Sequence, residues 1–257
     1  MLLEAENITK AFGAFKAVDN ASVTVEEGEI LGLIGPNGAG KSTFFNCLTG
    51  DLLPTSGTVK FLGTEVTRMS PEARATLGIA RSFQVPLTFE SMSVTDNVMI
   101  GAFLRHPHAR DARAKAREVI ERVGLSAVAE APAKSLGTPG RKRLEIARAL
   151  AAEPKILLLD EAMAGLTPTE VQRAIELVRK IHGTGITLVI VEHIMEVIMS
   201  LADRVVVFHQ GREIARGAPR EVTRNEAVIE AYLGRRHAKK AADADAASAA
   251  GRTGGAS

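Results

Sequence analysis

The chain has 257 residues, of which 46% are hydrophobic and 24% charged, a balance typical of globular proteins. The net charge is only +2, aromatic residues make up 4%, and tryptophan is absent, so we expect no nucleic-acid partner. The single cysteine, Cys47, excludes an intrachain disulfide and is expected on the apolar face of a helix. No apolar run in the sequence reaches the ~18 residues of a membrane-spanning helix, so a role at a membrane requires a partner.

The first part of the chain is expected to form strands around one glycine-rich loop and one helix. Val23 and Val25 alternate with polar residues, as in a half-buried strand, and residues 30–34 form a buried one. The glycine-rich loop then leads into a helix at about 42–48. A turn at 54–57 precedes a strand at 58–62.

The middle of the chain changes to helix, and the last part alternates strands with helices. Residues 91–152 read as a helical insertion, with helices expected at 111–123 and 141–152. The following alternation is typical of a parallel sheet with crossover helices. It predicts strands at 156–160, 186–191 and 204–208, helices at 168–182 and 194–201, and a hairpin turn at 210–211 into residues 213–215. From residue 235 the tail has almost nothing to bury, so we expect disorder, with a frayed alanine-rich helix as the alternative.

A phosphate-binding motif lies between the second predicted strand and the first predicted helix. Residues 35–42 read Gly-Pro-Asn-Gly-Ala-Gly-Lys-Ser and match G-x-x-x-x-G-K-[ST]. Glycines let successive N–H groups face phosphate oxygens, and the helix N-terminus adds positive potential. Lys41 supplies a charge for the β- and γ-phosphates, and Ser42 a hydroxyl ligand for Mg²⁺. The predicted nucleotide-binding residues here are Gly35, Pro36, Asn37, Gly38, Ala39, Gly40, Lys41, Ser42 and Thr43.

Two carboxylates, Asp160 and Glu161, follow the apolar run 156–159. Parallel sheets bind their ligands at the carboxyl ends of their strands. We therefore expect Asp160 to hold Mg²⁺, and Glu161 to polarise an attacking water as a general base. An apolar run that ends in Asp-Glu is usually only a strand end, but a phosphate loop upstream favours the chemical interpretation.

The order of these motifs makes the chain resemble the ATPase subunits of ABC transporters, from its first strand to about Gly234. The resemblance implies an α/β fold, a P-loop NTPase core with a mainly parallel sheet. It also implies an N-terminal antiparallel β subdomain and an inserted helical subdomain at about 91–152. ATP and Mg²⁺ are the implied cofactors. The implied organisation is an ATPase domain at 1–234 followed by the tail at 235–257.

Three further site residues are assigned by the resemblance. Phe12, followed by Gly13, stands where the family stacks an aromatic ring on adenine. Gln84 looks like the glutamine that reaches Mg²⁺ and the attacking water, next to the transmembrane partner. His193, after the strand predicted at 186–191, looks like the histidine that contacts the γ-phosphate. Taken alone, these would be a core phenylalanine, a solvated glutamine and a surface histidine. The implied catalytic residues are Glu161, His193 and Gln84, and the implied metal ligands are Ser42, Gln84 and Asp160.

Two segments depart from the family pattern. The signature loop usually reads Leu-Ser-Gly-Gly-Gln, and here the matching residues are Leu136, Gly137, Thr138, Pro139 and Gly140. Pro139 has no N–H to donate, although a helix expected to begin near Arg141 still points its N-terminus at the site. The family's next loop carries an aspartate where this chain has Thr167. A nucleotide site shared between two subunits is therefore expected in altered form.

Several segments are similar to the ATPases of branched-chain amino acid importers, at residues 45–50, 81–84, 142–150, 165–170 and 231–234. The resemblance implies two ATPase subunits that sandwich ATP as a dimer, transmembrane permease subunits, and a periplasmic substrate-binding protein. The location it implies is the cytoplasmic face of the cell membrane.

Three alternatives stay open at this point. One is the ATPase of a lipopolysaccharide exporter, which shares much of the pattern. Another is a soluble ABC ATPase of DNA repair or translation, although those usually carry two ATPase halves or a long coiled coil. The last is a degenerate subunit that binds ATP without hydrolysing it.

Overall fold

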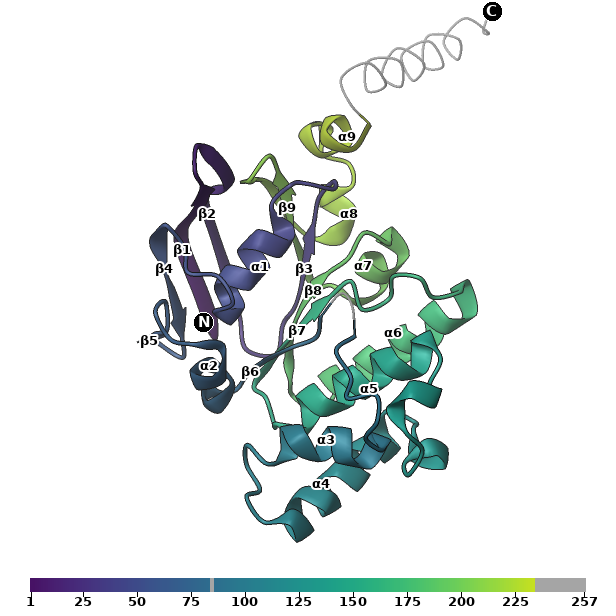
Figure 1. Cartoon of the computed structure of the whole chain (residues 1–257). Helices are drawn as coiled ribbons and strands as arrows, with labels where there is room; N and C mark the ends of the chain where they lie inside the picture. Colours follow the sequence, from purple (N-terminus) through teal and green to yellow (C-terminus); the bar gives the residue numbers. More distant parts are fainter. Residues whose placement is uncertain (84–85, 234–257) are drawn as a thin grey trace, which may run out of the picture.

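The computed structural model describes residues 1–83 and 86–233, which form two β-sheets and a group of helices (Figure 1). The first sheet is antiparallel throughout and has the order β2-β1-β4-β5. Its strands are β1 (Leu3–Phe12), β2 (Phe15–Val25), β4 (Ser56–Phe61) and β5 (Thr64–Glu65). An antiparallel β unit at the N-terminus is thereby confirmed.

The second sheet is mainly parallel, in the order β10-β9-β3-β8-β7-β6, and only β9 and β10 pair antiparallel. Its strands are β3 (Ile30–Ile34), β6 (Ile79–Arg81), β7 (Ile156–Asp160), β8 (Thr187–Val191), β9 (Arg204–His209) and β10 (Arg212–Gly217). The predicted strands at 30–34 and 156–160 are confirmed to the residue. Strand β6 was not predicted, because three residues are too few to show a period.

Helix α1 (Lys41–Thr49) lies between the two sheets, as Figure 1 shows. Its side chains Phe44, Phe45, Cys47 and Leu48 are buried in one apolar cluster with residues from both sheets. The expected place of Cys47 is confirmed, and burial raises the pKa of its thiol to about 11. The helix that follows the glycine-rich loop is therefore held on two sides.

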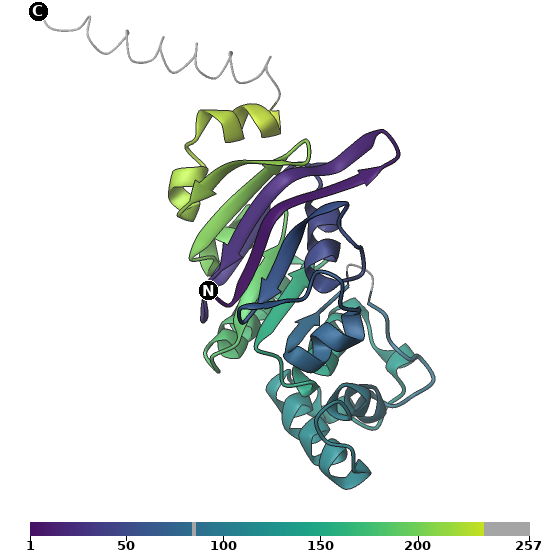
Figure 2. The same cartoon turned by 90° about the vertical axis from the view of Figure 1, so that its left-hand side faces the viewer.

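Three helices gather at one end of the molecule, far from the C-terminal helices (Figures 1 and 2). They are α3 (Val94–Ala102), α4 (Ala109–Arg122) and α5 (Thr138–Ala151), with short 3-10 turns at Ser126–Val128 and Ala133–Ser135 between the last two. The helical character of the middle segment is confirmed. Helix α5 begins at Thr138 instead of near Arg141, because Pro139 fits the first turn, where its missing N–H has no partner to lose.

The remaining helices are α2 (Pro71–Leu77), α6 (Pro168–His182), α7 (Met195–Leu201), α8 (Pro219–Val222) and α9 (Glu226–Leu233). Within 1–83 and 86–233, no helix is both long and apolar enough to cross a bilayer. The tail that we expect to be disordered lies outside the described residues, and so does Gln84.

Candidate active site

The loop between β3 and α1 contains glycines at positions where the surrounding backbone leaves no space for a side chain. Gly35 and Gly40 have φ angles of 151° and 98°, where side chains other than hydrogen are strained. A Cβ on Gly35 would lie 2.2 Å from the carbonyl oxygen of Phe208, and one on Gly40 would lie 2.2 Å from that of Ala17. The loop is thus pressed between a strand of the second sheet and a strand of the first.

Lys41 places a buried positive charge in this loop. Its ammonium group donates to the carbonyl oxygens of Gly35 at 2.7 Å and Pro36 at 3.1 Å. Burial lowers the pKa of Lys41, and the carboxylates of Glu161 and Asp160 partly oppose that shift. The first turn of α1 carries no acidic residue, so the helix dipole and the ammonium group together favour an anion here.

A cavity of about 530 Å³ opens beside this loop, and we name it the Lys41 cavity. The phosphate-loop residues, Glu161 and His193 come together in its wall. Its lining consists of Phe15, Ala17, Asn37, Gly38, Ala39, Gly40, Lys41, Ser42, Thr43, Glu161 and His193. Segments that lie more than a hundred residues apart in the chain are therefore gathered around one space.

The aromatic residue in this wall is Phe15, whereas Phe12 was expected. The two residues face each other across the turn between β1 and β2. Both are exposed, and only Phe15 lines the cavity, while the Phe12 ring lies 5.2 Å from the ammonium nitrogen of Lys10. Sequence spacing could not choose between them, because they flank the same two-residue turn.

Asp160 ends β7 at the carboxyl edge of the second sheet and is 5% exposed. Its backbone N–H donates to the hydroxyl of Ser82 at 3.1 Å, and its carboxylate lies 3.6 Å from the Arg81 guanidinium. Burial raises the pKa of Asp160, and Arg81 opposes the shift. The sequence analysis did not predict this contact of Arg81 with Asp160, since β6 itself was not predicted.

Glu161 occupies a strained turn directly after β7. Its φ angle is 45°, in the left-handed region, and its N–H donates to the Val191 carbonyl at 2.9 Å. Nδ1 of His193 lies 3.9 Å from Oε1 of Glu161. The predicted base and the predicted histidine are therefore neighbours at one edge of the sheet.

Magnesium has suitable ligands at this edge. The hydroxyl of Ser42 and the carboxylate of Asp160 are hard oxygen donors of the kind that Mg²⁺ prefers, with phosphate oxygens to complete its shell. Within the described ranges, no group of three His, Cys, Asp or Glu side chains could hold a metal ion unaided. The donor set fits an ion that binds together with a phosphate ligand.

The segment Leu136–Gly140 lies at the start of α5 and does not line the Lys41 cavity of its own chain. Gly137 is the N-cap of α5, without a side chain to cap it. Thr167, at the place of the family's aspartate, has a role that the sequence analysis did not give it. Its hydroxyl and the Glu170 side chain form a capping box at the start of α6.

Comparisons with known proteins agree with this geometry. A family described as ABC transporter matches residues 18–164, and one described as branched-chain amino acid ATP-binding cassette transporter matches residues 212–238. The high-affinity branched-chain amino acid transport ATP-binding protein LivG of Salmonella typhimurium is 38% identical, over 91% of this chain and 98% of the relative. BraF of Pseudomonas aeruginosa, described in the same words, is 35% identical over the same shares.

Solved structures show the same fold. A nucleotide-free ATP-binding cassette from an ABC transporter matches with a TM-score of 0.83 and 32% identity, over 91% of this chain and 99% of that one. The ADP conformation of the cassette MJ1267 matches with a TM-score of 0.82 and 32% identity, over 91% of this chain and 98% of the other. The chain therefore belongs to the ABC transporter ATPase family, in the group of the branched-chain amino acid transport ATP-binding proteins.

Proposed function

We propose that this chain binds ATP with Mg²⁺ in the Lys41 cavity and hydrolyses it to drive import of branched-chain or related amino acids through separate membrane subunits. The observation that carries the proposal is the convergence of the phosphate loop, Glu161 and His193 on that cavity. The substrate class rests on the names of the relatives and on the family match at residues 212–238. That match favours import over the lipopolysaccharide-export alternative.

The residues at the nucleotide site have different roles in the proposed reaction. The loop amides and Lys41 bind the phosphates, while Ser42 and Asp160, with Gln84, hold Mg²⁺, which when bound neutralises phosphate charge. Glu161 orients and polarises the attacking water, and His193 contacts the γ-phosphate. The short Glu161–His193 distance of 3.9 Å lets both side chains act on the same phosphate. We assign the adenine-stacking role to Phe15 in place of Phe12.

The second half of the nucleotide site comes from a second copy or a related subunit. The segment Leu136–Gly140 is absent from the lining of its own chain's Lys41 cavity, and it begins a helix whose N-terminus favours an anion. We infer that it contacts the ATP held by the partner subunit, so that ATP closes the dimer and hydrolysis releases it.

We propose that the permease binds in a groove of about 490 Å³ on the surface of the chain. It runs between α2 and β6 on one side and α3 and α5 on the other, and its lining is mainly apolar. Ile100 and Leu104 line it and remain exposed, and Leu87 and Phe89 are exposed close to the segment of Gln84. A cytoplasmic helix of a membrane subunit fits such a groove. We infer from the family that the chain lies at the cytoplasmic face of the cell membrane, beneath permease subunits to which a periplasmic binding protein delivers the substrate.

The decisive experiment is ATP hydrolysis by the full chain and its Glu161→Gln variant, with and without the candidate membrane subunits. We expect kcat to fall about 10²- to 10⁴-fold in the variant, because a positioned base contributes about that much, while ATP affinity changes little. Glu118→Gln on the surface of α4 is the matched control. Full activity of Glu161→Gln, or ATP binding without turnover in every setting, would contradict the proposal.

The groove has its own test. Leu104→Glu should leave basal hydrolysis unchanged and abolish the stimulation by membrane subunits, because a charge cannot enter an apolar contact without a partner. Met199→Glu makes the same kind of change on α7, where the exposed side chain lies outside the groove. Equal stimulation of the two variants would show that the permease binds elsewhere.

A further inference from the structure

A buried cluster of charged side chains holds the turn that carries Glu161. Lys142 of α5 is 8% exposed, and Glu192, the residue before His193, is 0% exposed. The Lys142 ammonium donates to the backbone carbonyl of Glu161 at 3.0 Å. Oε1 of Glu192 accepts the N–H of Met163 at 2.8 Å. Two residues of opposite charge, from different elements, thus hold the two ends of the turn 161–163.

Burying the charges of Lys142 and Glu192 costs free energy, so their burial needs a compensating reason. Burial lowers the pKa of Lys142, and the carboxylates of Glu192, Glu145 and Glu161 oppose the shift. Burial raises the pKa of Glu192, and its Oε2 atom has no hydrogen-bond partner among the described residues. Apolar residues of similar volume often stabilise a protein as much as buried charged residues do. The contacts of both side chains with the turn 161–163 give a reason for the buried charges other than stability.

The backbone conformation of the turn 161–163 requires stabilising contacts from outside the turn. Glu161 sits at a φ of 45°, which a residue with a Cβ adopts only when its surroundings enforce it. Its carbonyl oxygen accepts two bonds, one from the N–H of Ala164 at 3.1 Å and one from Lys142. Of these two bonds, the one from Lys142 comes from another element, so it fixes the turn relative to α5.

The same helix also holds Phe83 and Leu87, which lie in the sequence on either side of Gln84. One turn beyond Lys142, Glu145 accepts the N–H of Phe83 at 3.1 Å, and one turn further Arg148 donates to the Leu87 carbonyl at 2.5 Å. Spacings of three residues place these side chains along one face of α5. A single rigid helix therefore contacts the Glu161 turn and both flanks of the Gln84 segment.

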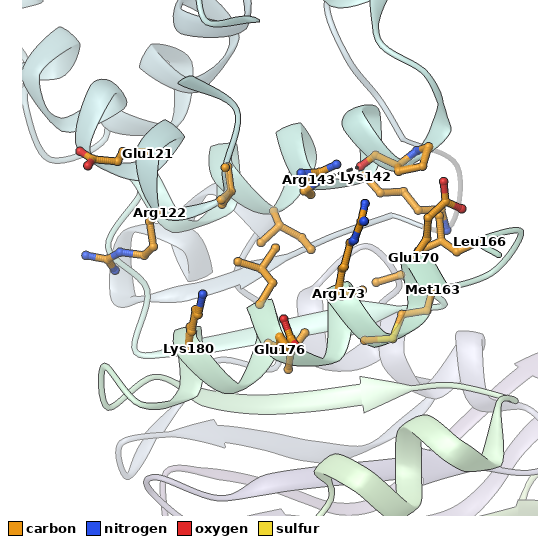
Figure 3. A pocket seen from close by; sticks show the side chains of 18 residues that line it. Glu121, Arg122, Lys142, Arg143, Met163, Leu166, Glu170, Arg173, Glu176 and Lys180 are labelled. Carbon is orange, nitrogen blue, oxygen red and sulfur yellow. Dashed lines mark hydrogen bonds between the residues drawn. The ribbon is translucent and has the colours of Figure 1, made fainter. Parts of the chain in front are cut away.

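Figure 3 shows where Lys142 lies. A groove of about 350 Å³ separates α5 from α6, with Lys142 and Arg143 on its α5 side and Met163 and Leu166 on the opposite side. The Lys142–Glu161 bond is thus a link across the boundary between the helical segment and the second sheet, and a movement of α5 would strain or break it.

We propose that Lys142 is a positioning residue for Glu161. Its bond to the Glu161 carbonyl sets the turn that directs the carboxylate into the Lys41 cavity, and α5 ties that setting to Phe83 and Leu87. The proposal rests on the proposed function, in which Glu161 polarises the attacking water. It predicts that loss of Lys142 impairs turnover and leaves nucleotide affinity nearly intact.

The test is steady-state ATP hydrolysis and ATP binding by the full chain carrying Lys142→Met. We expect kcat to fall at least about tenfold, because small misplacements of a catalytic group have effects of that size or more. The Kd for ATP should stay within about twofold, since Lys142 does not line the Lys41 cavity. Lys142→Arg, which can still donate, should recover most of the kcat. Arg143→Met is the control, because Arg143 donates at 3.4 Å to Pro139 of its own helix.

A second variant separates positioning from simple stability. Lys142→Met with Glu192→Gln removes both buried charges and keeps the Glu192 oxygen that holds Met163. Lys142→Met alone should lower the Tm, because it leaves the buried Glu192 without the nearby positive charge. We expect the double variant to regain the Tm of the parent chain while its kcat stays low. Recovery of both quantities, or a Lys142→Met enzyme with unchanged kcat, would overturn the inference. An active Glu161→Gln enzyme would overturn the proposed function instead, so the two failures are distinguishable.

Discussion

The molecule has two junctions at which a glycine-containing segment enters a helix, residues 35–40 directly before α1 and residues 136–140, which span the start of α5 at Thr138. In the first, Gly35 and Gly40 take positive φ angles and a Cβ on either would meet a backbone oxygen at 2.2 Å. In the second, Gly137 has a φ of −68°, and the nearest atom to a Cβ there is the Cδ of Pro139, at 3.9 Å. Packing within the chain leaves no space for a side chain at Gly35 and Gly40 of the first junction, whereas it leaves open space at Gly137 of the second.

This difference explains why one motif is intact and the other is altered. The phosphate loop must fit between two sheets of the same chain, so packing resists a side chain at Gly35 and at Gly40. The signature segment is expected to meet its ligand only in a partner subunit. Its own chain therefore tolerates Thr138 and Pro139 at positions where the family has glycine. The following predictions test that contrast, from the largest effect to the smallest.

Gly40→Ala should damage the first junction most. The new Cβ has no space beside the Ala17 carbonyl, and the φ of 98° is strained for alanine. We expect a loss of about 3 kcal/mol in ATP binding, or about 100-fold in Kd, measured by calorimetry. Gly38→Ala is the control, since its φ of 77° is also positive but no atom lies within 4 Å of a Cβ there. Equal effects of the two variants would show that packing is not the reason.

The rate of thiol labelling should differ between the two junctions by about 100-fold. Cys47 on α1 is fully buried, and its raised pKa of about 11, against 9.0, leaves about 100-fold less thiolate at pH 8. Iodoacetamide should therefore modify Cys47 at least about 100-fold more slowly than a cysteine introduced by Gly137→Cys in a Cys47→Ala background. Comparable rates would mean that α1 opens readily and that the first junction is not rigid.

Thr167→Ala should cost about 1 kcal/mol of unfolding free energy, because it removes the N-cap of α6. Thr167→Asp restores the family's residue and is itself a good cap, so its Tm should match that of the parent chain. Thermal unfolding of the three proteins is the measurement. A Thr167→Ala protein as stable as the parent would show that the capping box has little weight.

Gly137→Ser should have the smallest effect. Serine is a better N-cap than glycine by a few tenths of a kcal/mol, and the open space at residue 137 admits its side chain. We expect a slightly higher Tm, and hydrolysis at least equal to that of the parent chain, because the change restores the family's hydroxyl. A marked loss of activity would show that the altered signature segment is adapted to this chain and is not merely tolerated.

The sequence alone determined much of this protein. A strand, a glycine-rich loop ending in Lys41 and Ser42, and a helix in direct succession favoured phosphate binding over a plain glycine turn, because this arrangement presents backbone N–H groups to phosphate. Asp160 and Glu161 were placed by the apolar run before them, since the end of a parallel strand is where such sheets bind ligands. Local patterns of this kind suffice when the residues that act are neighbours in the chain.

The tertiary structure decided what depends on residues far apart in sequence. Phe15 lines the Lys41 cavity instead of Phe12, because the position of the β1–β2 hairpin over the loop selects one of two equivalent rings. The 3.9 Å between Glu161 and His193, and the bond from Lys142 across to the Glu161 turn, join separate strands and a helix. Such contacts arise when packing brings distant elements together, so no periodicity or spacing in the sequence encodes them.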